Sequence, residues 1–258
     1  MRLLCPTLLI ALSTSCASGM PQWEDADPDS EGIAQALLER SVSAVQGPNP
    51  VTELRVQYEG TWGFWVKRFQ PVLTDAGYRR TSTEILRPQE DVIEQLHVGP
   101  DGEKIVRWDG STIEAVYNGE EPADEAQERA AALVAEGYQL FLLGPRYLAT
   151  HAVGLRALDA VVEDGRTYER LIARLSPGLG FSEEDFVVLW VDAETDMPLR
   201  VHFTLEGLES TRGAHADTTY LTWVRVNGHA FPTEYVEHVR GPLGLKAHEW
   251  RVVNLEVR

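Results

Sequence analysis

The sequence predicts a mainly β protein of the α+β class, with about ten or eleven antiparallel strands in meander order and two or three helices. Two observations support this prediction. Short segments of alternating apolar and polar residues recur along the chain, separated by turn-forming pairs such as Asp-Gly and Asn-Gly, a pattern typical of strands with one buried face. One longer segment, residues 121–143, is rich in alanine and glutamate and repeats its apolar residues every three or four positions, as amphipathic helices do.

The N-terminus has the features of an export signal. Arg2 supplies positive charge, residues 3–12 form a short apolar core, and the end of the predicted signal (residues 1–15) is made of small residues. The next residues, Cys16-Ala17-Ser18-Gly19, resemble the lipobox of bacterial lipoproteins. That resemblance implies that Cys16 becomes the N-terminus and carries acyl chains such as palmitate, which anchor a protein to a membrane. Ser13 stands where that family prefers leucine, so an ordinary cleaved signal with an incidental cysteine is the alternative.

Residues 16–29 are acidic and contain prolines, which predicts a solvated tether between membrane and domain. Ala17, rather than aspartate, follows the cysteine, as in lipoproteins that are sent to the outer membrane. The resemblance therefore implies a lipid-anchored protein on the periplasmic face of that membrane. No internal linker divides the remaining chain, so residues 30–258 are expected to form a single domain.

The first half of the domain is predicted to begin with one helix and continue as strands. Asp29-Ser30 offers an N-cap, apolar residues follow at helical spacing, and Gly47-Pro48 ends the helix. Residues 60–65 form an aromatic patch broken by glycines, which suggests a bend or a bulge. The strands expected before residue 120 are 54–58, 78–86, 91–98, 104–108 and 112–117.

The second half is predicted to begin with a long helix near Pro122 that ends before Pro145. Residues 147–160 are ambiguous between a short helix and a strand. Residues 186–191 are apolar on both faces, which predicts a strand covered on both sides. The strands expected after the helix are around 156–162, 166–174, 186–191, 199–205, 218–226, 231–239 and 246–257, with Asn227-Gly228 as the strongest hairpin signal.

Charge and composition exclude several classes of function. The net charge is −17, from 40 acidic and 23 basic residues, and nucleic-acid binding requires clustered Lys and Arg. Both cysteines, Cys5 and Cys16, lie at the N-terminus, so a processed chain has no thiol for metal binding or catalysis. No run of 18 apolar residues is present, so no membrane-spanning helix is expected.

Three local motifs and the order of elements resemble the LolA/LolB-like lipoprotein-carrier superfamily. The motifs are Gly99-Pro100-Asp101-Gly102 before Val106–Gly110, Leu189–Asp192 before Met197-Pro198-Leu199, and the segment Val226–Pro232. The resemblance covers about residues 30–257. It implies a curved half-barrel sheet with helices packed in its concave side, and a hydrophobic groove between them that holds acyl chains. It supplies no catalytic residue.

The sequence contains none of the common catalytic motifs: no Gly-x-Ser-x-Gly elbow, phosphate-binding glycine loop or His-Glu-x-x-His. No pair of carboxylates stands out for glycoside hydrolysis. His202, His238 and His248 each occupy a polar position of an alternating strand and are expected to face solvent. Adjacent strands could still bring two or three histidines together around zinc or copper.

Large aromatic residues are the candidate ligand contacts. If the concave side of the sheet is incompletely filled, they would line an apolar groove; otherwise they are ordinary core residues. The candidates are Trp62, Phe64, Phe141, Trp190, Phe203 and Trp223.

These inferences predict a non-enzymatic cell-envelope lipoprotein that binds or carries a lipid, an acyl chain or a lipidated protein. It is expected to be monomeric, to use no cofactor or metal, and to contact the membrane through acyl chains on Cys16. The alternatives are an envelope scaffold with a fully packed sheet and, more weakly, a histidine-metal enzyme.

Overall fold

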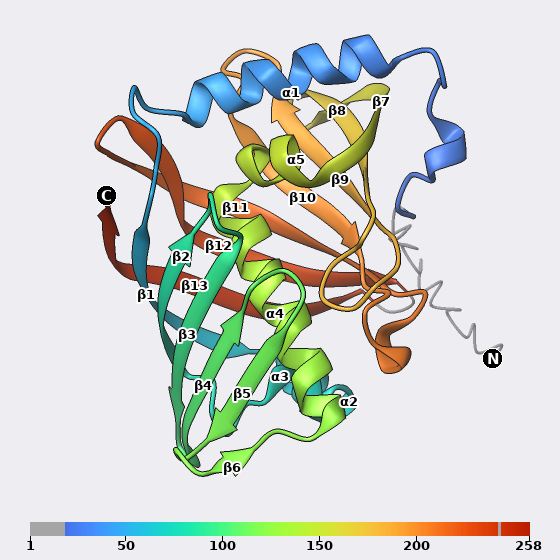
Figure 1. Ribbon diagram of the computed structural model, residues 1–258. Helices are drawn as coiled ribbons and strands as arrows, with labels where there is room; N and C mark the ends of the chain where they lie inside the picture. The colour runs from blue at the N-terminus through green and yellow to red at the C-terminus, as the bar shows by residue number, and fades with distance from the viewer. Residues whose placement is uncertain (1–18, 242–243) are drawn as a thin grey trace, which may run out of the picture.

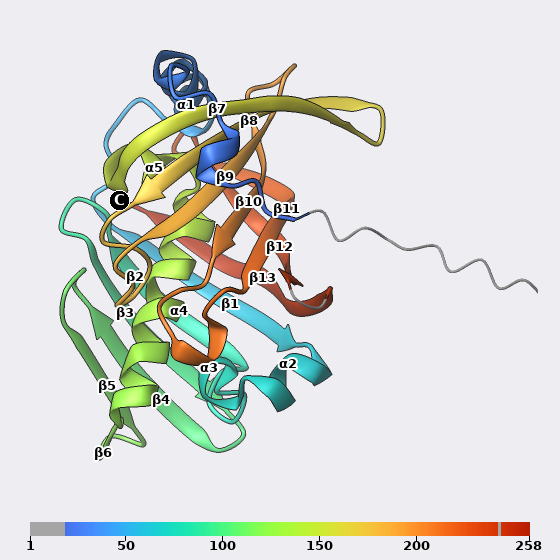
Figure 2. The same cartoon turned by 90° about the vertical axis from the view of Figure 1, so that its right-hand side faces the viewer.

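The computed structural model describes residues 19–241 and 244–258, and within them thirteen strands form one open antiparallel sheet (Figure 1). The sheet curls around the long helix α4. The helix α1 lies across the top of the sheet in both views, beside β7 and β8 (Figures 1 and 2). The mainly β class and the curved half-barrel with helices on its concave side are therefore confirmed. The export signal, Cys5 and Cys16 lie outside the described residues.

The described chain alternates between runs of strands and short groups of helices. The strands are β1 (Leu54–Trp62), β2 (Thr81–Arg87), β3 (Val92–Gly99), β4 (Gly102–Trp108), β5 (Ile113–Tyr117), β6 (Glu121–Pro122), β7 (Ala152–Glu163), β8 (Arg166–Leu175), β9 (Asp185–Asp192), β10 (Pro198–Thr204), β11 (His215–Val226), β12 (His229–Gly241) and β13 (Leu245–Val257). The helices are η1 (Trp23–Asp25), α1 (Glu31–Val45), α2 (Phe64–Phe69), α3 (Pro71–Thr74), α4 (Glu125–Leu143), α5 (Pro145–His151) and η2 (Glu209–Thr211).

The strand order follows the chain with one crossover. Strands β1 to β6 run outward to one edge, α4 and α5 carry the chain to the other edge, and β7 to β13 return to pair with β1. The first and last strands pair along most of their length, from Leu54 opposite Val257 to Trp62 opposite His248. This pairing joins the two hairpin arrays into one sheet.

Bulges and a glycine fit the centre of the sheet to its curvature. The β1–β13 register shifts between Gln57 and Tyr58, and such bulges bend a strand and increase its twist. Gly60 faces the Trp250 ring, and a Cβ at Gly60 would lie 2.3 Å from the nearest ring atom. Only glycine therefore allows Trp250 to pack closely against β1.

Helix α4 fills the concave side of the sheet, as its sequence predicts. Asp124 caps it by accepting a 2.9 Å hydrogen bond from the Gln127 amide, and it ends at Gly144, whose φ is +55°. Its residues from Ala130 to Leu143 are buried, with Val134 alone partly exposed. Burying an aromatic side chain such as Phe141 contributes about 3 kcal/mol, so α4 anchors the core.

Strand β9 is covered on both sides, as its double-faced apolar pattern predicts. Val187, Leu189 and Val191 point into the main core. The alternate residues, including Val188 and Trp190, pack on the outer face against the N-terminal segment.

The structure differs from the expected solvated tether over residues 19–29. Met20 and Ala26 are 6% and 4% exposed, and the Trp23 ring lies 5.9 Å from the Phe186 ring. Met20, Trp23 and Ala26, spaced three residues apart among acidic neighbours, pack this segment against the outer face of β9. Charge alone therefore predicts the wrong environment.

Sequence periodicity underestimates the number of elements. The short helices α2 and α3 occupy residues 64–74, which overlap the aromatic patch predicted over 60–65 and carry no predicted helix. Residues 147–160 divide between α5 and β7. Among the helices of residues 19–241 and 244–258, none combines the length and apolar character needed to cross a membrane.

Candidate functional site

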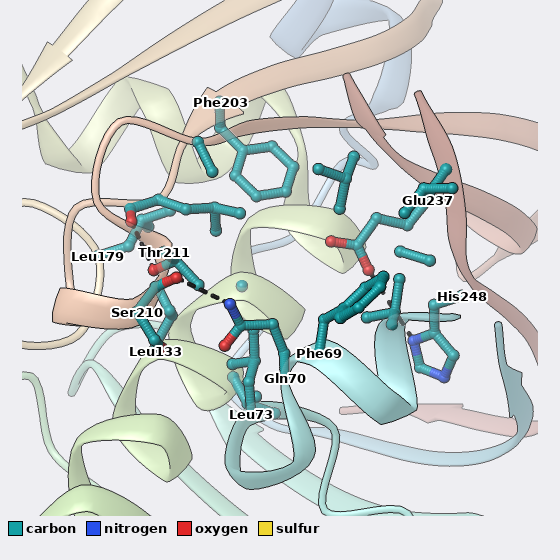
Figure 3. A pocket seen from close by; sticks show the side chains of 18 of the residues that line it. Phe69, Gln70, Leu73, Leu133, Leu179, Phe203, Ser210, Thr211, Glu237 and His248 are labelled. Atoms are coloured by element: carbon teal, nitrogen blue, oxygen red, sulfur yellow. Dashed lines mark hydrogen bonds and ion pairs between the residues drawn. The ribbon is translucent and has the colours of Figure 1, made fainter. Parts of the chain in front are cut away.

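A cavity of about 490 Å³ lies between the inner face of the sheet and the helices α2, α3 and α4 (Figure 3). Its walls are mainly apolar. They include Val66, Phe69, Leu73, Leu133, Val134, Phe141, Leu179, Phe203, Leu205, Val239 and Leu245. A concave, largely apolar space with few polar groups is the usual form of a small-molecule site.

The structure places three of the six candidate aromatics at this cavity: Trp62, Phe141 and Phe203. They come from β1, α4 and β10, far apart in sequence. The Phe141 and Phe203 rings pack 5.3 Å apart, so a helix and a strand together form one wall. Phe141 and Phe203 also belong to the buried core. The same two side chains are therefore both core residues and part of the cavity wall.

The other three candidates lie away from the cavity. Trp190 is on the outer face of β9, where the guanidinium groups of Arg170 and Arg200 lie 5.1 and 4.8 Å from its ring centre. The run 186–191 is apolar on both faces, so composition could not show which face meets the cavity. Phe64 begins α2 and is 68% exposed, and Trp223 packs at the margin of the core beside Tyr220.

A fixed arginine forms one polar part of the cavity wall. Arg79 is 2% exposed and donates hydrogen bonds to the Leu73 carbonyl (2.9 Å) and the Tyr138 hydroxyl (2.6 Å). Its guanidinium also lies 4.7 Å from the centre of the Trp62 ring, within cation–π range. These contacts hold the positive charge in place, and no carboxylate of the described residues forms an ion pair with it.

Glu237 and His248 form the other polar part, on the adjacent strands β12 and β13 (Figure 3). The His248 ring stacks on Trp62, with ring centres 3.7 Å apart and planes 2° apart. Desolvation, and then the charge of Arg79, keep its pKa well below 6.5, so the ring is neutral. Desolvation raises the pKa of Glu237 to about 7; Arg79 lowers it and Asp217 raises it further.

Sequence reasoning missed Arg79, Glu237 and His248. The predicted solvent-facing position of His248 is wrong: its side chain is 1% exposed, because it lies on the inward side of β13, against the Trp62 ring at the cavity. The alternation in β12 and β13 indicated the correct period but not which polar residues point inward. Arg79 falls within the expected strand 78–86, but β2 begins only at Thr81, and nothing in that pattern marks Arg79 as a cavity residue.

His202 also differs from expectation, whereas His238 is partly exposed. His202 is 4% exposed, and its Nε2 lies 2.7 Å from the His215 Nδ1. This pair is on the outer side of the sheet, level with Val188 and Asp217. Within the described part of the chain, no three His, Cys, Asp or Glu side chains are grouped to hold a metal ion.

A second hollow, of about 650 Å³, lies on the outer side of β1, β12 and β13. Charged residues dominate its lining, among them Glu59, Arg80, Glu234, Glu249 and Arg251. Its lining is much less apolar than that of the inner cavity, so the inner cavity is the stronger candidate site.

An open, curved antiparallel sheet that encloses an apolar cavity with its helices defines a half-barrel of the LolA type. The chain is similar to the crystal structure of a LolA superfamily protein from Nitrosomonas europaea, at 14% identity and a TM-score of 0.56 over 87% of this chain and 93% of that one. An outer membrane lipoprotein-sorting protein domain from Vibrio parahaemolyticus is more distant, at 10% identity and a TM-score of 0.43 over 89% and 94%.

The likeness to the Nitrosomonas europaea protein confirms at the level of the fold the resemblance expected from the sequence. No protein-family model matches the chain, and no curated protein matches it by sequence.

Proposed function

We propose that this protein is a non-enzymatic carrier of the bacterial cell envelope that holds a lipid, an acyl chain or a lipidated protein in the inner cavity. The cavity carries the proposal: its volume is about 490 Å³ and its walls are mainly apolar. Each methylene that leaves water for such walls contributes about 0.8 kcal/mol, or about fourfold in affinity.

The helix α2 supports a route for cargo into this cavity. Its residues Val66 and Phe69 line the cavity, while Phe64 and Trp65 are 68% and 54% exposed. Lys67 and Arg68 belong to the same helix and give it a local positive charge in an acidic protein. Exposed Trp and Phe beside basic residues suit the surface of an anionic membrane, from which an acyl chain would enter.

The expected anchor is acylated Cys16, which would hold this carrier on the periplasmic face of the outer membrane. This location is proposed on the lipobox resemblance alone. A scaffold with a fully packed sheet is the rival, and the volume of the cavity favours the carrier.

The test is native mass spectrometry of the mature chain carrying Cys16→Ser, with displacement of a fluorescent acyl probe in parallel. Val134 lines the cavity from α4 and is partly exposed to it, so Val134→Phe should fill the space and weaken acyl binding about tenfold. Ile33→Phe, at a position 67% exposed on α1, is the matched control and should bind like the native chain. No uptake by the native chain would refute the carrier.

A further inference from the structure

The inner cavity has one polar region at Glu237 and His248 and a second at Gln70, Ser210 and Thr211 (Figure 3). The first holds two ionisable side chains and defines the head of the cargo, an inference that rests on the proposed function. Glu237 and His248 lie together on one side of the cavity, whereas Leu133 and Leu179 lie on the other (Figure 3). An acyl chain in the apolar part would bring its head against Glu237 and His248.

Glu237 has its carboxyl group in the cavity wall with no hydrogen bond from residues 19–241 and 244–258. His248 Nδ1 lies 4.0 Å from its Oε2. Because His248 is neutral, this is not an ion pair, and 4.0 Å is too long for a direct hydrogen bond. One intervening hydroxyl group, which both donates and accepts, would bridge this separation.

His248 and the Trp62 ring that stacks on it also have unused hydrogen-bonding atoms. Both ring nitrogens of His248 and Nε1 of Trp62 are buried, and none of them has a partner within the described residues. A neutral imidazole presents one donor and one acceptor, and a buried polar group without a partner costs about 1–3 kcal/mol. A ligand group that both donates and accepts would satisfy them.

The charges around this region disfavour a charged head. Arg79 lies against the Trp62 ring that stacks on His248, Glu237 is the acidic group among the described lining residues, and Asp217 acts on Glu237 from the outer side of the sheet. An ammonium head would be repelled by Arg79. An anionic head would be attracted by Arg79 but repelled by ionised Glu237, so it would bind more tightly where Glu237 takes up a proton.

We propose that this region binds the head of the cargo and that the head is an uncharged hydroxyl or amide group, donating to the Glu237 carboxylate and accepting from the His248 ring. The class of cargo is then an acyl chain with a glycerol, other alcohol or amide head. Free fatty acids, alkyl sulfonates and alkyl amines are disfavoured at neutral and higher pH.

The test compares four amphiphiles with the same dodecyl chain, each displacing a fluorescent acyl probe from the mature Cys16→Ser chain. Their heads are glycerol, primary amide, sulfonate and trimethylammonium. At pH 8 the glycerol and amide compounds should bind about tenfold tighter than the two charged ones. The sulfonate should bind more tightly at pH 6 than at pH 8, because Glu237 is then protonated.

Two variants isolate the groups responsible. Glu237→Gln should remove the pH dependence of the sulfonate and strengthen its binding at pH 8. His248→Phe, which keeps the stacking on Trp62, should reduce the preference for the glycerol head. Glu234→Gln, on the outer side of the same strand, is the matched control and should change neither result.

The outcomes separate the two proposals. Uptake of all four amphiphiles with equal affinity, or an unchanged head preference in both variants, would overturn the proposed head group and leave the carrier standing. No uptake of any probe by the native chain would overturn the carrier, and the proposed head group with it.

Discussion

Buried ionisable residues concentrate on the inner face of β2 and β3, where they form a network beside the cavity. Glu84 is fully buried and accepts hydrogen bonds from the Ser82 hydroxyl (2.6 Å) and the Gln95 amide (3.0 Å). Desolvation raises its pKa from 4.5 to about 8, against those two hydrogen bonds and the charge of Arg79. Folded protein therefore holds this proton over a pH range in which unfolded protein releases it.

Glu84 makes the stability of the fold pH-dependent. Stability is fully present below pH 4.5 and falls by about 1.4 kcal/mol per pH unit until the folded pKa is reached. Glu84→Gln keeps an acceptor for Ser82 and Gln95 but cannot ionise. Its free energy of unfolding relative to the native chain should therefore rise by several kcal/mol between pH 5 and pH 8.5, measured by urea denaturation.

Glu103 provides the control for this experiment. It is exposed on β4, so Glu103→Gln should alter stability little and equally at both pH values. A Glu84→Gln chain whose advantage is the same at pH 5 and pH 8.5 would contradict a buried, proton-holding carboxyl group.

At the scale of residues, the property hardest to predict from the sequence was which side chains line the cavity. Trp62, Phe141 and Phe203 could be nominated because large aromatics dominate any apolar surface. Arg79 could not be, because its role depends on the carbonyl of Leu73 and the hydroxyl of Tyr138, which only the folded chain brings to it.

At the scale of elements, turn chemistry was the reliable signal. Asn227 and Gly228 both have positive φ, as do Asp164 and Gly165, and each pair joins the two strands that its sequence predicted. Helix α2 was missed because six residues are too few to show a helical period. Its three exposed aromatics, Phe64, Trp65 and Phe69, have no core-facing pattern.

The docked N-terminal segment, residues 19–29, is expected to contribute to the stability of the fold. The Trp23 ring packs on Phe186. The backbone carbonyl of Trp23 accepts a 3.0 Å hydrogen bond from the Arg156 guanidinium, which lies 4.3 Å from the centre of the Trp23 ring. Full burial of a tryptophan is worth about 3–5 kcal/mol, and Trp23 is half-buried. Trp23→Ala should therefore destabilise the protein by about 2 kcal/mol, lowering Tm by about 4–8 °C.

Trp65→Ala is the comparison for thermal unfolding, because Trp65 is 54% exposed and lies on α2. It should leave Tm nearly unchanged. If Trp23→Ala behaves in the same way, the N-terminal segment contributes no stability and a solvated tether is the better description of it.

At the scale of the whole molecule, the pairing of β1 with β13 makes the two hairpin arrays one scaffold around α4. Sequence periodicity could predict the arrays but not this closure, because pairing between residues 54–62 and 248–257 leaves no local signal. The cavity depends on the same long-range arrangement, since its walls come from α2, α4, β10, β12 and β13.

The docked segment also limits how far the domain can lie from a membrane. Met20 follows Cys16 by four positions, and four extended residues span at most about 14 Å. The start of the blue N-terminal segment and α2 both lie toward the right-hand side in Figures 1 and 2, at different heights. If Cys16 is acylated, the short connection therefore keeps the exposed aromatics of α2 close to the membrane surface.

This geometry predicts that the length of the connection controls cargo uptake. Inserting a long Gly-Ser segment between Ser18 and Gly19 of the acylated chain in vesicles lowers the effective concentration of α2 at its own bilayer. Transfer of a fluorescent acyl chain from that bilayer into the cavity should slow severalfold. The same insertion at Gly119, where a turn faces open space, should leave the rate unchanged, and equal rates for both insertions would show that the anchor does not position α2.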